Sequence, residues 1–458
     1  MCASPTCRKF APWLLCALWT ASSGLAVGEC SKGDEGHCAI AGGEAEESTL
    51  FIGDVGFEEL SQALGRRPTS WKNKHIAPIL ASIGEGDYGE VARLRLVFRD
   101  EGRSAAAPAS AAGAGAAPPQ SAWVVKRVVP KSEEDVGSDE RNLTEHWRFL
   151  EGFAVEAAAY ESLAAPLGAA GLAMPKLLLA TEPRPLGRPF TIIMEDLTER
   201  FPRGASGQVR RVHPKEREAS LRWIAGFHAA FWENARAEER GLWRRGSFWI
   251  FDKLAQLEMR EVPDGYSIPY LSADEVRRLR AAGPAIDARL AGRPAGTRHL
   301  DDAPAPRHRT LVHGDAKPEN ILCSPPDGTE VNCAGLDFGW VGEGYGTYDL
   351  IYMLWDVLAT NQVEQLLQEY HEMLMARLPA GVGLEYTPAV MRQHFELCTL
   401  DFMRWMVGFR KLGREHFWAM PWAITVLREV LDKLDVGALL DSEEAYAEAV
   451  NREYPLAL

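Results

Sequence analysis

Short apolar runs separated by polar turns mark the second half of the chain. Two such runs, at 311–312 and 321–322, flank the polar stretch H-G-D-A-K-P-E-N. A third run, Val331 to Leu336, directly precedes Asp337. Brief apolar runs bounded by turn residues are typical of buried strands. The pattern therefore predicts that strand ends hold Asp315 and Asp337 in fixed loops that face one cleft.

A glycine-rich turn lies between two strand-like runs in the first half of the chain, at 79–83 and 91–98. It has the form G-x-G-x-x-G-x-V and consists of Gly84, Gly86, Gly89 and Val91. Glycines allow the backbone to come close to phosphate groups and to donate N–H groups to them. A helix after this motif would indicate a dinucleotide fold, but a strand follows, which favours a nucleotide-binding hairpin of the kinase type.

The next predicted strand, Trp123 to Val129, carries Lys126. This strand resembles the V-A-I-K strand of kinases, and the resemblance implies that Lys126, which follows a glycine-rich hairpin, contacts the α- and β-phosphates of a nucleotide. Apolar residues at helical spacing predict a helix over 147–163. Glu156 in this helix is the best candidate to pair with Lys126, and Glu151 is the competitor that periodicity does not exclude.

Helical spacing recurs at 56–64, at 216–232 and through most of 362–440. His228 sits among apolar positions of the second of these segments, where a histidine is usually part of the core. Residues 100–122 are mainly Ala, Gly, Pro and Ser and predict a flexible insertion between two strands. The fold class expected is α+β, with a small antiparallel sheet and helix followed by a larger, mainly helical part.

Composition limits the range of functions. The chain has 458 residues, of which 46% are hydrophobic, so it can bury a large core in two lobes. Lys and Arg number 50 against 64 Asp and Glu, a net charge of −14, which argues against nucleic acid or an anionic membrane as the main partner. No apolar run reaches the length of a transmembrane span. The sequence carries no signal for an oligomeric state.

The amino terminus has the layout of a targeting leader. Within residues 1–26, Arg8-Lys9 precede an apolar segment and then small residues, as in a secretory signal or an organelle leader. Without such a role for this segment the chain would be cytoplasmic. Residues 1–48 together are expected to be a leader or a disordered extension.

Cysteines are concentrated in the same region. Five of the eight lie within the first 38 residues, and the other three show no C-x-x-C spacing: Cys323, Cys333 and Cys398. A disulfide scaffold or a zinc site is therefore not expected in the folded part.

Three polar residues around the central loop have the chemistry that phosphoryl transfer requires. The carboxylate of Asp315 can accept the proton of an attacking hydroxyl. The amide oxygen of Asn320 and the carboxylate of Asp337 can hold Mg²⁺, a cation that prefers oxygen ligands. H-x-D-x-x-x-x-N followed by D-F-G, with Asp337 22 residues after Asp315, is far more specific than either motif alone.

These motifs resemble the catalytic loop of the protein-kinase-like superfamily, and Gly314 after His313 is the form seen in aminoglycoside phosphotransferases and choline kinases. From about residue 50 the chain resembles the ecdysteroid-kinase-like, or choline-kinase-like (CHK), branch. The resemblance implies a bilobal fold, with an N-lobe at 49–196 and a C-lobe at 197–458. It implies an ATP- and Mg²⁺-dependent kinase that phosphorylates a hydroxyl of a small molecule. In that family the Asp-Leu at Asp349 closes a short loop and orients the catalytic loop.

Two alternatives remain open at this point. A protein Ser/Thr kinase is supported by Lys317, which in that group touches the transferred phosphate, and by D-F-G rather than D-F-Q. Against it, no A-P-E follows, and Asp349 comes only 12 residues after Asp337, which leaves little room for an activation segment. A nucleotide-binding pseudokinase would normally lack Lys126, Asp315 or a metal ligand, and this chain has them all.

Overall fold

A computed structural model of the chain describes residues 51–52, 55–65, 70–78, 88–97, 120–203, 212–250, 253–268, 270–296, 307–354, 360–411, 420–435, 440 and 442–456. The expected leader at 1–48 and the expected strand at 79–83 lie outside these ranges. Two residues of the glycine motif, Gly84 and Gly86, also lie outside them.

The amino-terminal part is built on a five-stranded antiparallel sheet in the order β3-β4-β5-β7-β6. The strands are β3 Ser70–Pro78, β4 Gly89–Val97, β5 Gln120–Val128, β6 Leu177–Ala180 and β7 Phe190–Glu195. Central strand β5 pairs Lys126 with Val91 of β4 and with Ile192 of β7. Its β-branched residues suit a strand buried between two neighbours. Lys126 is therefore fixed in the middle of the sheet.

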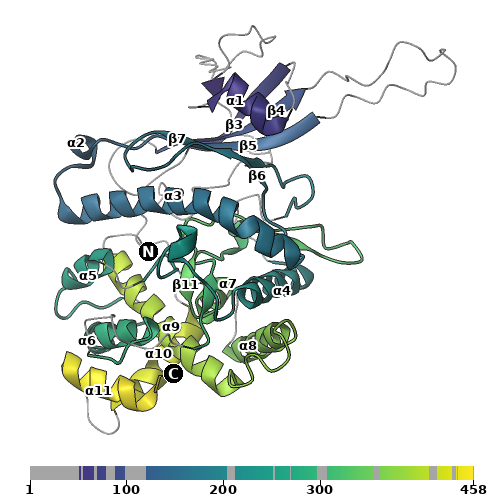
Figure 1. The fold of residues 1–458 in the computed structure, drawn as a ribbon. Coiled ribbons are helices and arrows are strands. Elements are labelled where there is room, and N and C mark those ends of the chain that lie inside the picture. The colour runs from purple at the N-terminus through teal and green to yellow at the C-terminus, as the bar shows by residue number, and fades with distance from the viewer. Residues whose placement is uncertain are drawn as a thin grey trace, which may run out of the picture.

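A hairpin and a helix precede the sheet, and two helices follow β5. The hairpin pairs β1 Phe51–Ile52 with β2 Val55–Gly56, and α1 Phe57–Leu64 comes directly after it. After β5 come α2 Glu133–Val136 and the long α3 Glu140–Ala169, which crosses below the sheet (Figure 1). The helix expected over 147–163 begins earlier because the Asp139 side chain caps it by accepting the Asn142 N–H.

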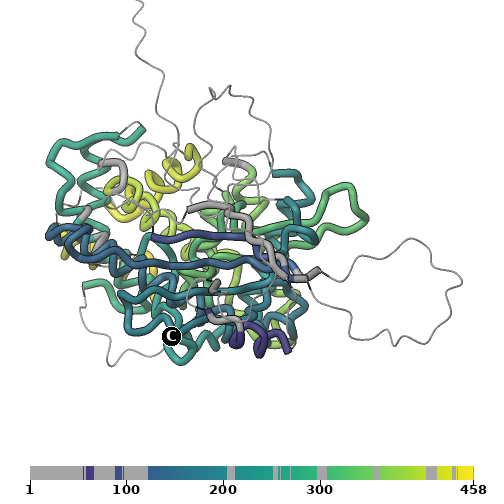
Figure 2. Tube along the Cα trace, turned by 90° about the horizontal axis from the view of Figure 1, so that it is seen from above, coloured from purple at the N-terminus to yellow at the C-terminus, as the bar shows by residue number. Residues whose placement is uncertain are grey.

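Helices make up most of the carboxy-terminal part (Figure 1). They are α4 Pro214–Ala230, η1 Glu238–Arg240, α5 Lys253–Arg260, α6 Ala273–Leu290, α7 Thr347–Met353, α8 Thr360–Met375, α9 Pro388–Lys411, α10 Pro421–Asp435 and α11 Glu443–Glu453. The α4 helix matches the segment expected at 216–232, and Pro214 at its first position and a capping box from His213 fix its start. Seen from above, the sheet lies over these helices (Figure 2).

Two short ladders between the sheet and the helices carry the polar loops. Strand β8 Thr310–Val312 pairs with β11 Gly342–Gly344, and β9 Ile321–Cys323 pairs with β10 Cys333–Gly335. The 3-10 turn η2 Pro318–Asn320 leads into β9. The apolar runs at 311–312, 321–322 and 331–336 thus form the strands that the sequence predicts, and the α+β class is confirmed.

Part of the expected insertion at 100–122 is strand. β5 begins at Gln120, so residues 120–122 pair with β4, with Ala122 opposite Arg95. The residues from 98 to 119 lie outside the described ranges. Within the residues that the structure describes, no helix has the length and apolar character needed to cross a bilayer.

Candidate active site

The loop after β8 has a backbone that only glycine can adopt at Gly314. Its φ is +80°, and a Cβ there would lie 2.2 Å from the Trp340 carbonyl oxygen and 2.7 Å from the Ser247 nitrogen. The left-handed conformation disfavours a side chain, and the close backbone neighbours exclude one. The glycine of H-G-D therefore allows the loop to pass directly against residues 340 and 247.

The carboxylate of Asp349 holds this loop. It accepts the His313 N–H at 2.7 Å and the Gly314 N–H at 2.8 Å, and it lies 3.0 Å from His228 Nε2. Asp349 lies inside the first turn of α7, which begins at Thr347, so it is not the N-cap of this helix. Its oxygens are used by the loop, which agrees with the orienting role that the family resemblance implies.

His313 joins the two polar loops. Its ring is buried, and Nε2 lies 2.9 Å from the carbonyl oxygen of Leu336, the residue before Asp337. Burial lowers the pKa of His313, so the ring is neutral and its Nε2–H can donate to that carbonyl. His228 is likewise buried, and its Nδ1 lies 2.7 Å from the Tyr370 hydroxyl, so it is a partnered core histidine.

Asp315, Lys317 and Asn320 form one hydrogen-bonded group. Lys317 Nζ donates to Asp315 Oδ2 at 2.6 Å, and Asn320 Nδ2 donates to the same oxygen at 3.0 Å and to the Asp315 carbonyl at 2.8 Å. Burial raises the pKa of Asp315 to about 6, against the opposing effect of Lys317. The carboxylate is therefore mainly ionised at neutral pH and able to accept a proton.

Lys126 meets the carboxylates of Glu156 and Asp337. Its ammonium group donates to Glu156 Oε2 and lies 3.8 Å from Asp337 Oδ1. Burial alone would lower the pKa of Lys126, but the two carboxylates more than reverse this and hold it above its ordinary value. Glu151, the competing candidate, instead pairs with Arg184 at the surface. The geometry thus favours Glu156 as the partner of Lys126.

Tyr160 is a further member of this group that the sequence does not single out for chemistry. Its hydroxyl donates to Glu156 Oε1 at 3.3 Å and accepts the Asp337 N–H at 3.2 Å. Asp337 itself has a φ of +61°, in the left-handed region. The tyrosine therefore connects α3 to an unusual backbone position. The pattern E-x-x-x-Y places Tyr160 one helical turn after Glu156 and is the signal that could have indicated this contact.

A cavity of about 440 Å³, counted with its opening to solvent, joins these residues. Its lining is mainly apolar and includes Lys126, Glu156 and Asp337. The lining residues are Val91, Val124, Lys126, Glu156, Tyr160, Pro175, Met194, Glu195, Leu197, Leu322, Leu336 and Asp337. A mainly apolar lining with a few charged groups has the chemistry to hold a purine ring with attached phosphates.

Of the glycine motif, the structure describes Gly89 and Val91. Gly89 has a φ of +131°, and a Cβ would lie 1.9 Å from the Arg127 carbonyl oxygen. Tyr88 before it is buried, and its hydroxyl is hydrogen-bonded to His146 Nδ1 on α3. The end of the motif is therefore held against β5 and α3, close to Lys126.

The donor set fits Mg²⁺. Asn320 uses its Nδ2 toward Asp315, so its amide oxygen, which these contacts do not use, is a possible metal ligand. Across the described ranges, no group of three or more His, Cys, Asp or Glu side chains is placed to hold a metal ion. Two oxygen ligands, from Asn320 and Asp337, would fit the usual case in which phosphates and waters complete the coordination of Mg²⁺.

One covalent link contradicts the cysteine analysis. Cys323 and Cys333 form a disulfide across β9 and β10. They stand directly opposite each other in the ladder, and this tertiary pairing cannot be deduced from their spacing of ten residues. Cys398 is a free, buried thiol.

A family model described as the phosphotransferase enzyme family (APH) matches residues 119–382, more than half of the chain. The match includes Lys126, Glu156, Asp315 and Asp337, while the glycine motif lies before it. No curated protein has a sequence that matches this chain.

Several solved structures are similar to the chain. The GDP complex of wild-type aminoglycoside 2'-phosphotransferase-IIIa is 15% identical, over 67% of this chain and 85% of that one, with a TM-score of 0.36. A microcompartment-associated aminopropanol kinase is 12% identical, over 84% and 94%, with a TM-score of 0.39. The choline kinase LicA from Streptococcus pneumoniae is 14% identical, over 82% and 95%, with a TM-score of 0.36.

Proposed function

Because this chain belongs to the phosphotransferase enzyme family, we propose that it transfers the γ-phosphoryl group of ATP, in the presence of Mg²⁺, to a hydroxyl group of a small molecule. In this proposal residues 49–196 bind the nucleotide, and residues 197–458 carry the catalytic loop and the acceptor site.

The observation that supports the proposal most directly is the 3.8 Å separation between Lys126 Nζ and Asp337 Oδ1, two groups that line one cavity. A cation from the sheet and a carboxylate from the loop after β10 meet where the phosphates of a bound nucleotide would lie. Phosphoryl transfer depends mainly on positioning and charge neutralisation, and this pair supplies both.

Each residue has one role in the proposed reaction. Lys126, held by Glu156, binds the α- and β-phosphates, and the turn at Gly89 and Val91 covers them. Mg²⁺ held by Asn320 and Asp337 would neutralise charge on the phosphate oxygens.

The catalytic loop would act on the acceptor. Asp315 orients the acceptor hydroxyl and takes its proton, which the raised pKa of its carboxyl favours. Lys317 stabilises the charge on the transferred phosphate.

The test is ATP turnover by the purified chain with pooled small-molecule alcohols, with and without Mg²⁺. Asp315→Ala is expected to lose turnover by about 10²- to 10⁴-fold, the usual contribution of a general base, and to keep nucleotide binding. Asp327→Asn changes an exposed aspartate in the β9–β10 turn and is the matched control, with turnover unchanged. Turnover by Asp315→Ala at the wild-type rate would refute the role of Asp315, and transfer only to protein substrates would refute the acceptor class.

A further inference from the structure

The Cys323–Cys333 disulfide closes the hairpin whose ends carry both proposed Mg²⁺ ligands. β9 begins directly after Asn320, and β10 ends two residues before Asp337. The Leu336 N–H donates to the Asn320 carbonyl at 3.0 Å, which makes these two residues the next pair along the ladder. We propose that this disulfide positions Asn320 and Asp337 for metal binding by fixing the register of the hairpin.

The ladder is too short to fix its own register. It contains only the pairs 321–335, 322–334 and 323–333, and a two-stranded ladder of this size is marginally stable by itself. Single backbone bridges, from Ala173 to Ala334 and from Arg203 to Cys323, add to it at its two edges. A slip by one residue would turn every side chain to the other face and move Asp337 by about 3.3 Å relative to Asn320. A bond between Cys323 and Cys333 is compatible with the observed register alone.

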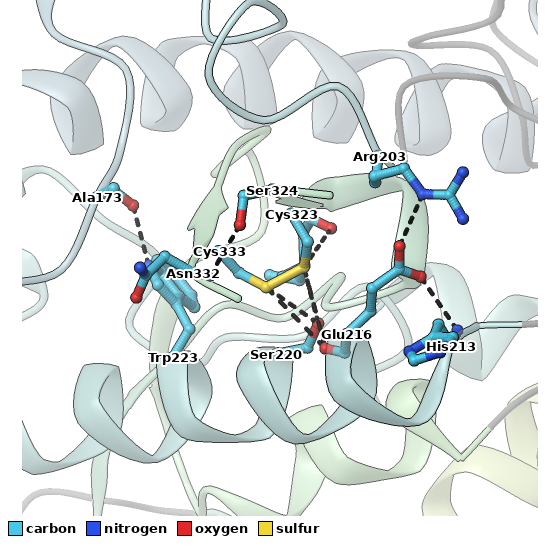
Figure 3. The surroundings of a disulfide bond; sticks show 11 residues. Ala173, Arg203, His213, Glu216, Ser220, Trp223, Cys323, Ser324, Asn332 and Cys333 are labelled. Carbon is cyan, nitrogen blue, oxygen red and sulfur yellow. Dashed lines mark hydrogen bonds and ion pairs between the residues drawn. A yellow bond between two sulfur atoms is a disulfide. The ribbon is translucent and has the colours of Figure 1, made fainter. Parts of the chain in front are cut away.

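The disulfide is itself held in place by α4. Figure 3 shows both sulfur atoms against this helix, with the Ser220 hydroxyl 3.4 Å from Cys323 Sγ and 3.7 Å from Cys333 Sγ. Both cysteines are buried. On the same helix the Trp223 indole donates to the Ala173 carbonyl at 2.9 Å and lies where a Cβ on Gly335 would clash. The hairpin therefore packs against α4 at both ends: at the disulfide through Ser220, about 10 Å along the strand from Asn320, and at Gly335, opposite Ile321, through Trp223.

The proposed positioning is reversible in chemical terms. A dithiol reagent can break the S–S bond by supplying two electrons and two protons, which gives two cysteine thiols and the disulfide of the reagent. In the reduced chain no covalent bond fixes the register of the hairpin, which then depends on the ladder hydrogen bonds, on the backbone bridges to Ala173 and Arg203 and on packing against α4. We therefore expect weaker metal binding without unfolding of the chain.

The inference rests on the proposed metal role of Asn320 and Asp337, so its test measures binding directly. Binding of Mn²⁺ in the presence of a non-hydrolysable ATP analogue is followed by the electron paramagnetic resonance signal of the free ion. Replacement of both cysteines, Cys323→Ala with Cys333→Ala, is expected to weaken Mn²⁺ binding about ten-fold, the lower end of the usual effect of groups that orient metal ligands. Binding of the analogue without metal is expected to stay unchanged, because the cysteines do not line the cavity.

Reduction provides the matched comparison in the native sequence. Dithiothreitol is expected to weaken Mn²⁺ binding by wild type and by Cys398→Ala, which removes the described free thiol, and to have no effect on the double variant. Should the double variant fail to fold, reduction of folded wild type still measures the effect. A double variant or reduced wild type that melts at a lower temperature but binds Mn²⁺ as tightly as oxidised wild type would overturn the inference, since the bond would then only stabilise the fold.

The same assay separates this inference from the proposed function. If oxidised wild type binds no Mn²⁺ with the analogue, or if Asp337→Asn binds it equally well, the proposed metal site fails and the inference fails with it. If binding is present, is lost in Asp337→Asn and is equal in the double variant and wild type, the inference alone fails.

Discussion

Lys126 Nζ lies 3.8 Å from Asp337 Oδ1, and this contact joins the central strand of the sheet to the loop that follows β10. Glu156 contacts the same ammonium group, so one buried cation faces two acidic side chains. Burial raises the pKa of Glu156, against the effect of Lys126. A site with more acidic than basic groups has the electrostatics to accept a divalent cation next to the phosphates.

Replacement of the partner of Lys126 is expected to weaken nucleotide binding and destabilise the fold. Glu156→Gln leaves a buried ammonium group with one carboxylate, and breaking a buried ion pair typically costs about 3–5 kcal/mol of unfolding free energy. Urea unfolding and nucleotide titration measure the two effects.

Glu151→Gln is the matched control for this prediction, because it changes a glutamate of the same helix. Glu151 pairs with Arg184, whose side chain is 50% exposed. Such a pair contributes about 0–1 kcal/mol. If both variants changed nucleotide affinity equally, the Lys126–Glu156 contact would have no specific role.

A methyl group at Gly314 is expected to disrupt the catalytic loop. Gly314→Ala would place a Cβ 2.2 Å from the Trp340 carbonyl oxygen at a positive φ. We expect a loss of more than about 4 kcal/mol in unfolding free energy, because both backbone segments would have to move. Gly171→Ala has a similar φ of +72° with nothing within 4 Å, so it should cost only about 1–2 kcal/mol. Equal melting temperatures for the two variants would contradict the packing argument.

The strands and helices follow from local pattern, and the polar contacts follow from tertiary structure. The apolar runs that flank 313–320 predict β8 and β9 because short buried strands need little more than apolar residues between turns. Apolar residues at helical spacing likewise predict the helix over 147–163. Its start at Glu140 depends on the Asp139 cap, which lies before the apolar stripe.

The site could be predicted only in part. The choice of Glu156 over Glu151 required the structure, since both lie on one helix and only its packing decides which one reaches Lys126. Pairing of Cys323 with Cys333 depends on the register of two strands that are separated by a turn. The backbone N–H groups that Asp349 accepts belong to a loop 35 residues away, which local pattern does not connect to α7.

The stability of the chain is expected to fall in mild acid because of His394. Its ring stacks on Tyr345 at 3.8 Å between centroids, and burial, with a smaller effect of nearby His308, lowers its pKa to about 3. The unfolded chain accepts this proton near pH 6.5, so below that pH it binds one proton more than the native state. The stabilisation is therefore complete above pH 6.5 and is lost as the pH falls toward 3.

Between pH 7 and pH 5 this histidine should cost about 2 kcal/mol. His394→Phe, which keeps a ring against Tyr345, is expected to remove that part of the pH dependence in urea unfolding. His308 also has a pKa lowered by burial and contributes a slope of the same sign in the variant, whereas the raised pKa of Asp315 contributes one of the opposite sign in both chains. An unchanged slope in His394→Phe would show that His394 does not remain neutral in the native state.

The last prediction concerns the carboxylate that holds the catalytic loop. Asp349→Asn replaces one acceptor oxygen by an amide N–H₂ group, which cannot accept a hydrogen bond. One of the two backbone N–H groups, that of His313 or that of Gly314, therefore loses its acceptor. The loop must shift, and Asp315 shifts with it. Because a displacement of about 1 Å can reduce a rate about 100-fold, we expect a fall of that order in kcat, with nucleotide affinity unchanged.

Asp401→Asn is the control, since Asp401 is equally buried but pairs with Arg404 on α9. Asp401→Asn should lose about 3–5 kcal/mol of unfolding free energy, comparable to the loss in Asp349→Asn, while the folded enzyme keeps its kcat. Equal losses of kcat in both variants would mean that the effect of Asp349 is on stability alone.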